Sequence, residues 1–264
     1  MRIASVGHAV FAAVFIFVGL LGLIRNDYGL VWYAVPKDFP ARELFPYLYS
    51  LISLAAGLGL LWRRTSAPAA RLALVYVLAW MVLFKLRYVL MHAGTEVYYE
   101  SWGETAVQVA AAWVLYVWFA EDWDKRHLAF ATGDRGLRIA RVIYGLAMIA
   151  FGLSHFAYLD NTASLVPGWL PGHVYWAYFT GSAYIAAGVA VLVGFYARLA
   201  AALSVVQMGG FTLLIWLPVV AKGTNDPSMW GEFVVSIALT ASGWVMADSY
   251  RGTRWLTPFK PKAT

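Results

Sequence analysis

Cysteine is absent from this chain of 264 residues. Its absence excludes disulfides, thiolate nucleophiles, cysteine-ligated zinc or iron–sulfur clusters, and dithiol redox relays. If the protein takes part in redox chemistry, it therefore has to borrow a cofactor from outside the polypeptide.

Charge is also scarce. Charged residues make up 13% of the chain, whereas 61% is hydrophobic and 17% aromatic, and the mean hydropathy is +0.64. Because a soluble domain has about 25% charged residues, this composition indicates a membrane protein. The net charge of +6 would suggest a nucleic acid partner. However, the charges lie in short loops between apolar runs, so membrane topology explains them and no nucleic acid partner is predicted.

Long apolar runs divide the chain into eight predicted membrane helices. Runs of about 18–24 residues can cross roughly 30 Å of hydrocarbon as helices. The first run is followed by no small-residue cleavage site, so we interpret it as a helix and not as a signal peptide. The predicted fold class is all-α, a polytopic membrane protein with spans near 6–24, 43–62, 70–92, 102–120, 138–157, 174–194, 198–221 and 229–247.

Positive charges are distributed unevenly between the two sets of connecting segments. Fourteen of the 20 lysines and arginines lie on the side that holds both chain ends, four lie on the opposite side, and Lys85 and Arg87 lie within a span. Because cytoplasmic loops are rich in Lys and Arg, this asymmetry places both termini in the cytoplasm. We therefore predict a multi-pass protein of the bacterial inner membrane, with the WGE segments at its outer surface.

Short sequences recur in the same order in the two halves of the chain. LAAGLGLLW (54–62) resembles IAAGVAVLV (185–193), and GTEVYYESWGE (94–104) resembles GTNDPSMWGE (223–232). Each half has an even number of predicted spans, so the copies run parallel, as in transporters whose repeats are related by an axis along the membrane normal. The predicted organisation is a four-helix unit at 1–120, a charged cytoplasmic linker at 121–137, a second four-helix unit at 138–250 and a basic tail at 251–264.

Both copies place a glutamate at the start of their last span, Glu104 in SWGET and Glu232 in MWGEF. One interpretation of Glu104 is a capping box, with Ser101 as the N-cap and Glu104 as the third helical residue. Glu232 would lie nearly two turns into a helix that begins at Asp226 and Pro227, which is too deep for capping. The alternative for both glutamates is a role in the bundle interior, where a carboxylate usually has a polar partner.

Candidate partners for these carboxylates lie at a similar depth. Lys85 and Arg87 are two residues apart, so they point to different sides of the third span and one of them is expected to meet a given glutamate. The second copy has His155 where the first has Gly22. The alternatives are snorkelling of Lys85 and Arg87 to the surface, a structural ion-pair network, and a buried histidine that hydrogen-bonds a loop carbonyl.

The second copy resembles the DoxX and DoxX-like membrane proteins. The segment GLSHFAYLDNTASLVPGWLPGHVYWAYFTGSAYIAAGVAVLVG (152–194) has a Gly-x-x-His start, a Pro-rich outer loop and an aromatic entry to the next span. A basic turn at Arg198 and a Gly-Glu start of the fourth span fit the same family. The first copy matches more weakly, because it lacks the histidine and has a longer charged loop. The chain would then be a tandem duplication of the family's four-helix unit.

The resemblance implies a redox-associated protein, because the family includes a membrane subunit of a thiosulfate:quinone oxidoreductase. It places Glu104 and Glu232 at the family's glutamate position and His155 at its histidine position. Family membership does not by itself establish chemistry, and whether this chain is an enzyme is left open.

We predict an outer polar pocket between helices that binds a quinone or a similar lipophilic molecule. His155 and Glu232 are the predicted catalytic residues, which exchange protons, and Lys85 or Arg87 would stabilise an anionic reduced ring. The predicted partners are membrane lipid and a redox partner protein. The other predicted ligand-binding residues are Glu104, Trp102, Trp230, Trp169 and His173.

Other functions and cofactors are weighed against this prediction. The alternatives are a carrier or channel for a small solute or lipid, although the spans look continuous, and a non-catalytic membrane scaffold subunit. A haem between His92 and His155 and a metal held by His155, His173 and Asp160 or Glu232 have little support from ligand spacing. Neither a metal nor a haem is therefore predicted.

Overall fold

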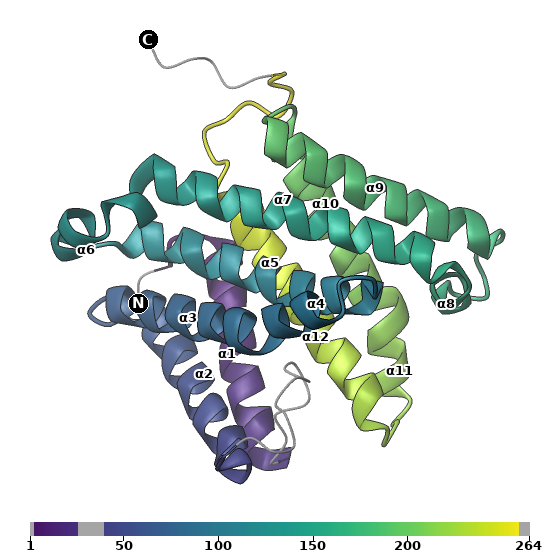
Figure 1. Cartoon of the computed structure of the whole chain (residues 1–264), viewed down its shortest axis with the longest axis horizontal. Coiled ribbons are helices and arrows are strands. Elements are labelled where there is room, and N and C mark those ends of the chain that lie inside the picture. Colours follow the sequence, from purple (N-terminus) through teal and green to yellow (C-terminus); the bar gives the residue numbers. More distant parts are fainter. Residues whose placement is uncertain (1–2, 26–39, 259–264) are drawn as a thin grey trace.

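The structure, a computed structural model, describes residues 3–25 and 40–258 (Figure 1). Within these ranges the chain forms helices joined by turns and short loops, and it contains no β-strand. The outer loop of the first copy at 31–39 and the tail beyond 258 lie outside the described residues.

Four long helices form each half of the described chain. Those of the first half are α1 (Val6–Arg25), α2 (Phe45–Leu61), α3 (Ser66–Trp80) and α5 (Glu96–Phe119). Those of the second half are α7 (Gly133–Ala157), α9 (His173–Val193), α10 (Ala197–Phe211) and α12 (Pro227–Asp248). The shorter elements are η1 (Arg42–Leu44), η2 (Met81–Leu86), α4 (Arg87–Met91), α6 (Asp122–His127), η3 (Ala129–Ala131), α8 (Leu159–Leu165), η4 (Thr212–Trp216) and α11 (Leu217–Ala221).

Seven helical stretches of the described chain are long and apolar enough to cross a membrane. They confirm the predicted all-α, polytopic membrane fold. The predicted span 102–120 falls in α5, whose 24 residues make it long enough to cross, at about 1.5 Å per residue. Polar residues such as Glu104 and Gln108 lower its apolar content, so the count of eight spans stays a prediction.

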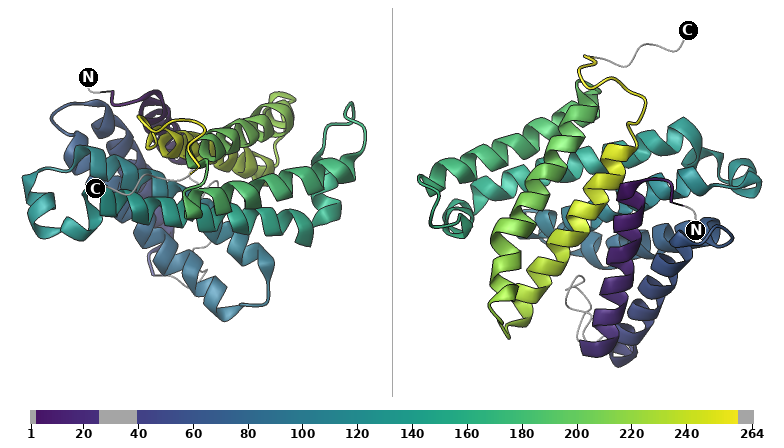
Figure 2. Two further views of the ribbon diagram at one scale, coloured as in Figure 1. Left: turned by 90° about the horizontal axis from the view of Figure 1, so that it is seen from above. Right: turned by 180° about the vertical axis from the view of Figure 1, so that it is seen from behind.

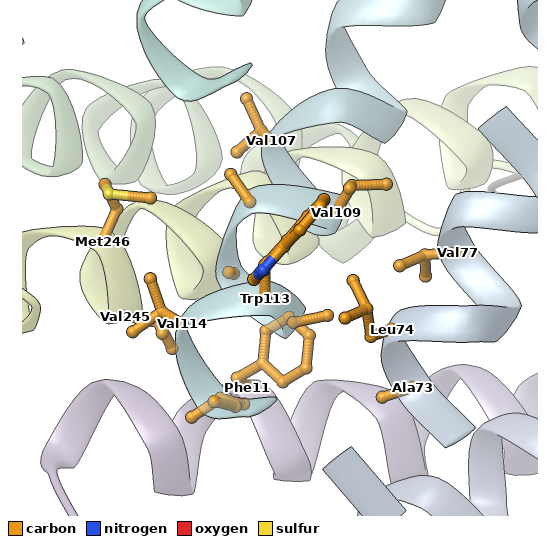
Figure 3. Packing of buried hydrophobic residues seen from close by; sticks show 14 of the residues in the cluster. Phe11, Ala73, Leu74, Val77, Val107, Val109, Trp113, Val114, Val245 and Met246 are labelled. Carbon is orange, nitrogen blue, oxygen red and sulfur yellow. The ribbon is translucent and has the colours of Figure 1, made fainter. Parts of the chain in front are cut away.

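Helix α5 lies at the centre of the bundle, where it packs against α3, α7 and α12. Its residues Val107, Val109 and Val114 are fully buried. Figure 3 shows them among Phe11 of α1, residues of α3, and Met246 of α12. Because other helices cover α5, few of its side chains have to face lipid, and the helix tolerates the polar residues that reduce its hydropathy.

The two halves have the same order of helix packing. In the first half α1 packs on α2, α2 on α3 and α3 on α5; in the second half α7 packs on α9, α9 on α10 and α10 on α12. The halves meet where α5 packs on α7 and α1 on α12, and α5 also contacts α12. Figure 2 shows α1 and α12 side by side in the view from behind.

The third span of each half changes to a π-helix part-way along. These segments are Met81–Leu86 in the first half and Thr212–Trp216 in the second. The sequence predicts continuous spans here, so the paired π-helical segments are a difference from expectation. π-Helical turns inside α-helices are rare and often lie at functional sites.

The bundle has two ends that carry different chemistry. We call the end that holds the first residues of α2, α5, α9 and α12 the distal end. The opposite end, which holds the described N- and C-terminal residues, is the proximal end. The predicted site residues belong to the distal end, and most of the arginines belong to the proximal end.

An ion-pair cluster joins three elements at the proximal end. The side chain of Asp124 in α6 is fully buried. It accepts hydrogen bonds from Arg71 of α3 at 2.7 and 2.6 Å and from the Tyr116 hydroxyl of α5 at 3.1 Å. Arg71 also pairs with the more exposed Glu121 at 2.9 Å. The cluster therefore fixes α6 against the ends of α3 and α5.

This cluster predicts a loss of stability in acid. The hydrogen bond from Arg71 is the main cause that holds the pKa of Asp124 below its ordinary value. A lowered folded pKa stabilises the protein above the unfolded value of about 3.9, and this stability is lost as the pH falls through the folded pKa.

Thermal unfolding of the wild type and of Asp124→Asn, compared at about pH 6 and about pH 3, tests this prediction. The variant should be less stable by about 1–3 kcal/mol at the higher pH, because Arg71 and Tyr116 lose a charged acceptor. It should also lose less stability on acidification than the wild type does. Equal losses in the two proteins would show that another group controls the acid response.

Candidate functional site

The two WGE segments lie at different depths in their helices. Helix α5 begins at Glu96, after Thr95, so Ser101 and Glu104 lie beyond its first turn and the predicted capping box is wrong. In α12 the N-cap is Asp226, whose side chain accepts a hydrogen bond from the backbone N–H of Ser228 at 2.9 Å. This helix start confirms the prediction for Asp226 and leaves Glu232 too deep for capping.

Carboxylates gather along one face of α5 near its distal end. Glu96, Glu100 and Glu104 are spaced four residues apart, so they lie one above another on the helix. Glu232 of α12 is close enough to interact electrostatically with Glu100 and Glu104. The sequence analysis missed Glu96 and Glu100, although their spacing from Glu104 was a visible signal. We call Glu100, Glu104, Glu232 and Lys85 the acidic cluster.

Lys85 is the cation that the structure places beside these carboxylates. It is buried, with 3% of its surface exposed. Its Nζ donates a hydrogen bond to the Ser101 hydroxyl at 2.6 Å, and its charge interacts with Glu104. Snorkelling is therefore the wrong interpretation for Lys85.

Arg87 lies on the other side of the third span. Its side chain is exposed and forms no ion pair with any residue of the described ranges. This confirms the prediction that Lys85 and Arg87 point in different directions. Arg87 is thus outside the acidic cluster, and its part in ligand binding stays a prediction.

Glu104 and Glu232 differ in burial. Glu104 is partly buried, whereas Glu232 is exposed at the edge of the cluster. The buried face of α12 runs through Gly231, Val234 and Val235, and Glu232 lies about 100° around the helix from Gly231. The sequence favoured a position for Glu232 in the bundle interior. The structure instead places this side chain at the edge.

His155 lies between α7, α9 and α10. Its ring is 5.3 Å from the Tyr184 ring, edge-on, and 5.9 Å from the Phe211 ring, stacked. Its Nδ1 is 2.7 Å from the carbonyl oxygen of Phe151 in its own helix. Because a carbonyl accepts and does not donate, Nδ1 carries a proton, and it is the protonated nitrogen when the ring is neutral. The nitrogen Nε2 is then free to accept a hydrogen bond.

A glycine on α9 makes room for His155. A Cβ added to Gly181 would lie 2.9 Å from the Cβ of His155. In the first half the arrangement is reversed, because a Cβ added to Gly22 would clash with the Ser50 hydroxyl. The second half therefore pairs histidine with glycine at the helix crossing where the first half pairs glycine with serine.

Glu100 connects the histidine side of the site with the acidic cluster. Its carboxylate interacts with the Ser154 hydroxyl, next to His155, and with the charge of Glu232. Tyr184 interacts with Gln207, whose Nε2 donates to the carbonyl of Thr180 at 3.0 Å. The result is a continuous polar region that joins α5, α7, α9, α10 and α12.

The other predicted ligand residues take different positions. Trp102 is partly buried and packs against the hydrophobic core, and Trp230 donates its Nε1–H to the carbonyl of Thr224 at 3.0 Å. Trp169 is 70% exposed and His173 begins α9. Among the described residues no contact joins Trp169 or His173 to His155.

The structure does not support the metal site considered above, which would use His155, His173 and a carboxylate. Across residues 3–25 and 40–258, no three His, Asp or Glu side chains are placed to hold a metal ion. What the site offers is a histidine, carboxylates, one buried lysine and aromatic rings. These groups can exchange protons and contact a flat ring, and they do not form a coordination sphere.

A known protein family matches part of the second half of the chain. Residues 136–216 match the model of the DoxX family. These residues are a DoxX domain. The match runs from α7 through η4, so it contains His155, Tyr184 and Gln207, and it confirms the predicted resemblance. No curated protein and no solved structure matches the chain significantly.

Residues 136–216 carry the match to the DoxX family, and the apolar helices of the chain indicate a multi-pass membrane protein. The family match ends before α12 and does not include the first half. Glu232, Glu104 and Lys85 therefore lie outside the matched residues, and their roles rest on the geometry described above.

Proposed function

We propose that this DoxX protein binds a quinone or a similar lipophilic redox molecule at its distal polar region and exchanges protons with it. One observation carries the proposal: the imidazole ring of His155 lies beside the Tyr184 and Phe211 rings, and Tyr184 interacts electrostatically with the carboxylate of Glu100. A quinone needs hydrogen-bond partners at its carbonyl oxygens and aromatic or apolar contacts for its ring. The DoxX match adds the family's association with quinone chemistry.

In this proposal the residues handle protons and the electrons come from elsewhere. Oxidation of a quinol releases two protons and two electrons, and a chain without cysteine has no dithiol to take the electrons. A redox partner protein would exchange them. His155 would accept one proton at Nε2 and the carboxylate of Glu100 would accept the other, while Lys85 limits the negative charge on the carboxylates.

We also propose a location and an orientation. The excess of Lys and Arg at the proximal end favours a cytoplasmic location for that end and for both termini. The distal region would then face the outer side of a bacterial inner membrane. The apolar helices of the chain contact membrane lipid in any orientation.

A carrier for a small solute is the second candidate, and the paired π-helical segments favour it. Interruptions at corresponding places in two repeats often mark the substrate site of a transporter. Here one of the two segments carries Lys85 beside Glu104. We further infer that the chain arose by duplication of the four-helix unit, because helix order, packing partners and π-helical segments agree between the halves.

Loss of His155 should weaken quinone binding. We expect His155→Ala to lower the affinity for decylubiquinone about tenfold, because the ring loses one hydrogen bond and one aromatic contact. Quenching of tryptophan fluorescence in the purified protein measures this affinity. The matched control is His127→Ala in the proximal linker, where the ring stacks on Trp123, and it should bind as the wild type does.

Two results would count against the quinone proposal. One is a lipid extract of the purified protein without quinone, together with no saturable quenching by decylubiquinone. The other is equal quenching by the two histidine variants. If quinone binding is absent and proton flux into liposomes depends on Glu104, the carrier becomes the better explanation.

A further inference from the structure

A basic cavity of about 310 Å³ lies at the proximal end, opposite the candidate functional site. It is enclosed by the first turns of α7, the end of α9, the start of α10 and the segment that follows α12. Neither an aspartate nor a glutamate is among the described residues that line it. Four arginines do line it, which are Arg138, Arg141, Arg198 and Arg254.

Two of these arginines, Arg141 and Arg198, are held in place without acidic partners. The guanidinium of Arg141 lies 3.9 Å from the centre of the Tyr250 ring, and Arg198 donates a hydrogen bond to the carbonyl of Thr253. Asp134 acts on Arg141 electrostatically, but no ion pair joins them. In the described part of the chain, none of the four arginines forms an ion pair. Their positive charge is therefore available to a ligand.

The cavity also contains a buried hydroxyl group. Tyr250 lines the cavity and is 6% exposed, and its hydroxyl has no hydrogen-bond partner among the described residues. A buried donor without an acceptor is unfavourable. A phosphate oxygen would accept from this hydroxyl and from the guanidinium groups together.

An apolar groove of about 750 Å³ continues from the cavity along α9. Val193 lines both the groove and the cavity. The lining positions recur every three or four residues, so they form one face of the helix. This face is roughly 16 Å long at 1.5 Å per residue. The groove residues are Ser182, Ile185, Ala186, Val189, Ala190, Val193 and Phe195.

We propose that the cavity and the groove bind one anionic phospholipid. Its phosphate headgroup lies among the arginines and the Tyr250 hydroxyl, and one acyl chain lies along the α9 face. Charge complementarity selects an anionic headgroup over a zwitterionic one, as in basic pockets between membrane helices at the cytoplasmic side. A free phosphate has the same headgroup chemistry but leaves the groove empty. The proposal does not depend on the function of the distal region.

Lipid retention by the full chain in detergent tests the proposal. Native mass spectrometry should show dioleoyl-phosphatidylglycerol bound about tenfold more tightly than dioleoyl-phosphatidylcholine. Arg138→Gln/Arg254→Gln should weaken phosphatidylglycerol binding about tenfold. Both side chains are exposed and neither forms a hydrogen bond with another described residue, so this variant should fold.

Two further variants separate a bound lipid from general attraction to charge. Arg63→Gln/Arg64→Gln removes the same charge from the exposed α2–α3 turn and should leave retention unchanged. Ala186→Phe fills the exposed groove without changing charge and should weaken retention. The proposal is overturned if the two lipids bind equally, or if the Arg63/Arg64 variant loses as much binding. It is also overturned if Ala186→Phe has no effect on lipid retention. A last contrary result is that inorganic phosphate alone raises the melting temperature of the protein as much as phosphatidylglycerol does.

Discussion

Lys85→Met is expected to destabilise the protein by about 1–3 kcal/mol, because it removes a buried charge that donates to the Ser101 hydroxyl and interacts electrostatically with Glu104. Methionine keeps the length of the side chain, so the core packing around this position changes little. The loss is electrostatic. Glu104, Glu100 and Glu232 then share the distal region without the cation that the structure places beside Glu104, and the Ser101 hydroxyl loses its donor.

A second substitution should recover part of this stability. In the Lys85→Met background, Glu104→Gln removes the carboxylate that was left without its partner, and the double variant should be more stable than Lys85→Met alone. The interaction energy from such a cycle is typically about 0.5–3 kcal/mol for residues in one network. Apparent melting temperatures of the four proteins in one detergent provide the measurement.

Arg87→Met is the matched control for this experiment. It removes the same kind of charge two residues away, from an exposed side chain without a described ion pair. A surface substitution of this kind usually changes stability by less than about 0.5 kcal/mol. If Lys85→Met were as mild as Arg87→Met, Lys85 would not be the structural counter-charge of Glu104.

The start of α5 shows what sequence reasoning could not decide. SWGE fits the capping-box pattern locally, and nothing in those four residues excludes it. The helix starts at Glu96 instead, because the preceding span ends at Met91 and the chain turns within His92–Thr95. Where that turn falls depends on packing of α4 and α5, which a local motif does not contain. For α12, by contrast, the Asp226-Pro227 pair is specific enough to predict the helix start from the sequence alone.

The orientation of the glutamates on their helices marks a second limit. The repeat correctly indicates that Glu104 and Glu232 belong to one region, and electrostatic contact between them supports this. Their unequal burial follows from which face of α12 packs in the bundle. That face passes through Gly231, one residue from the glutamate, and a sequence with nearly uniform hydrophobicity around the helix does not reveal it. Glu100 differs from these cases, because its four-residue spacing from Glu104 is enough to place the two carboxylates on one face of a helix.

The second large effect is expected at the crossing of α7 and α9. Gly181→Ser should destabilise the protein by about 1–3 kcal/mol, because the added atoms meet a close-packed site. A Cβ at this position would lie 2.9 Å from the Cβ of His155 and 3.0 Å from the Phe156 ring. The control is Gly210→Ser in α10, where a Cβ meets nothing within 4 Å. It should change the melting temperature much less.

Adding His155→Gly to Gly181→Ser recreates the pairing of the first half, where Gly22 faces Ser50. The double variant should be more stable than the sum of its two single changes predicts, since each change makes room for the other. It should nevertheless bind decylubiquinone as weakly as His155→Ala does. This combination separates two roles of the histidine, because the double variant restores the packing without restoring the ring nitrogen. Recovered stability together with wild-type quinone binding would mean that His155 only fills space, and the proton-exchange role would then have to belong to the carboxylates alone.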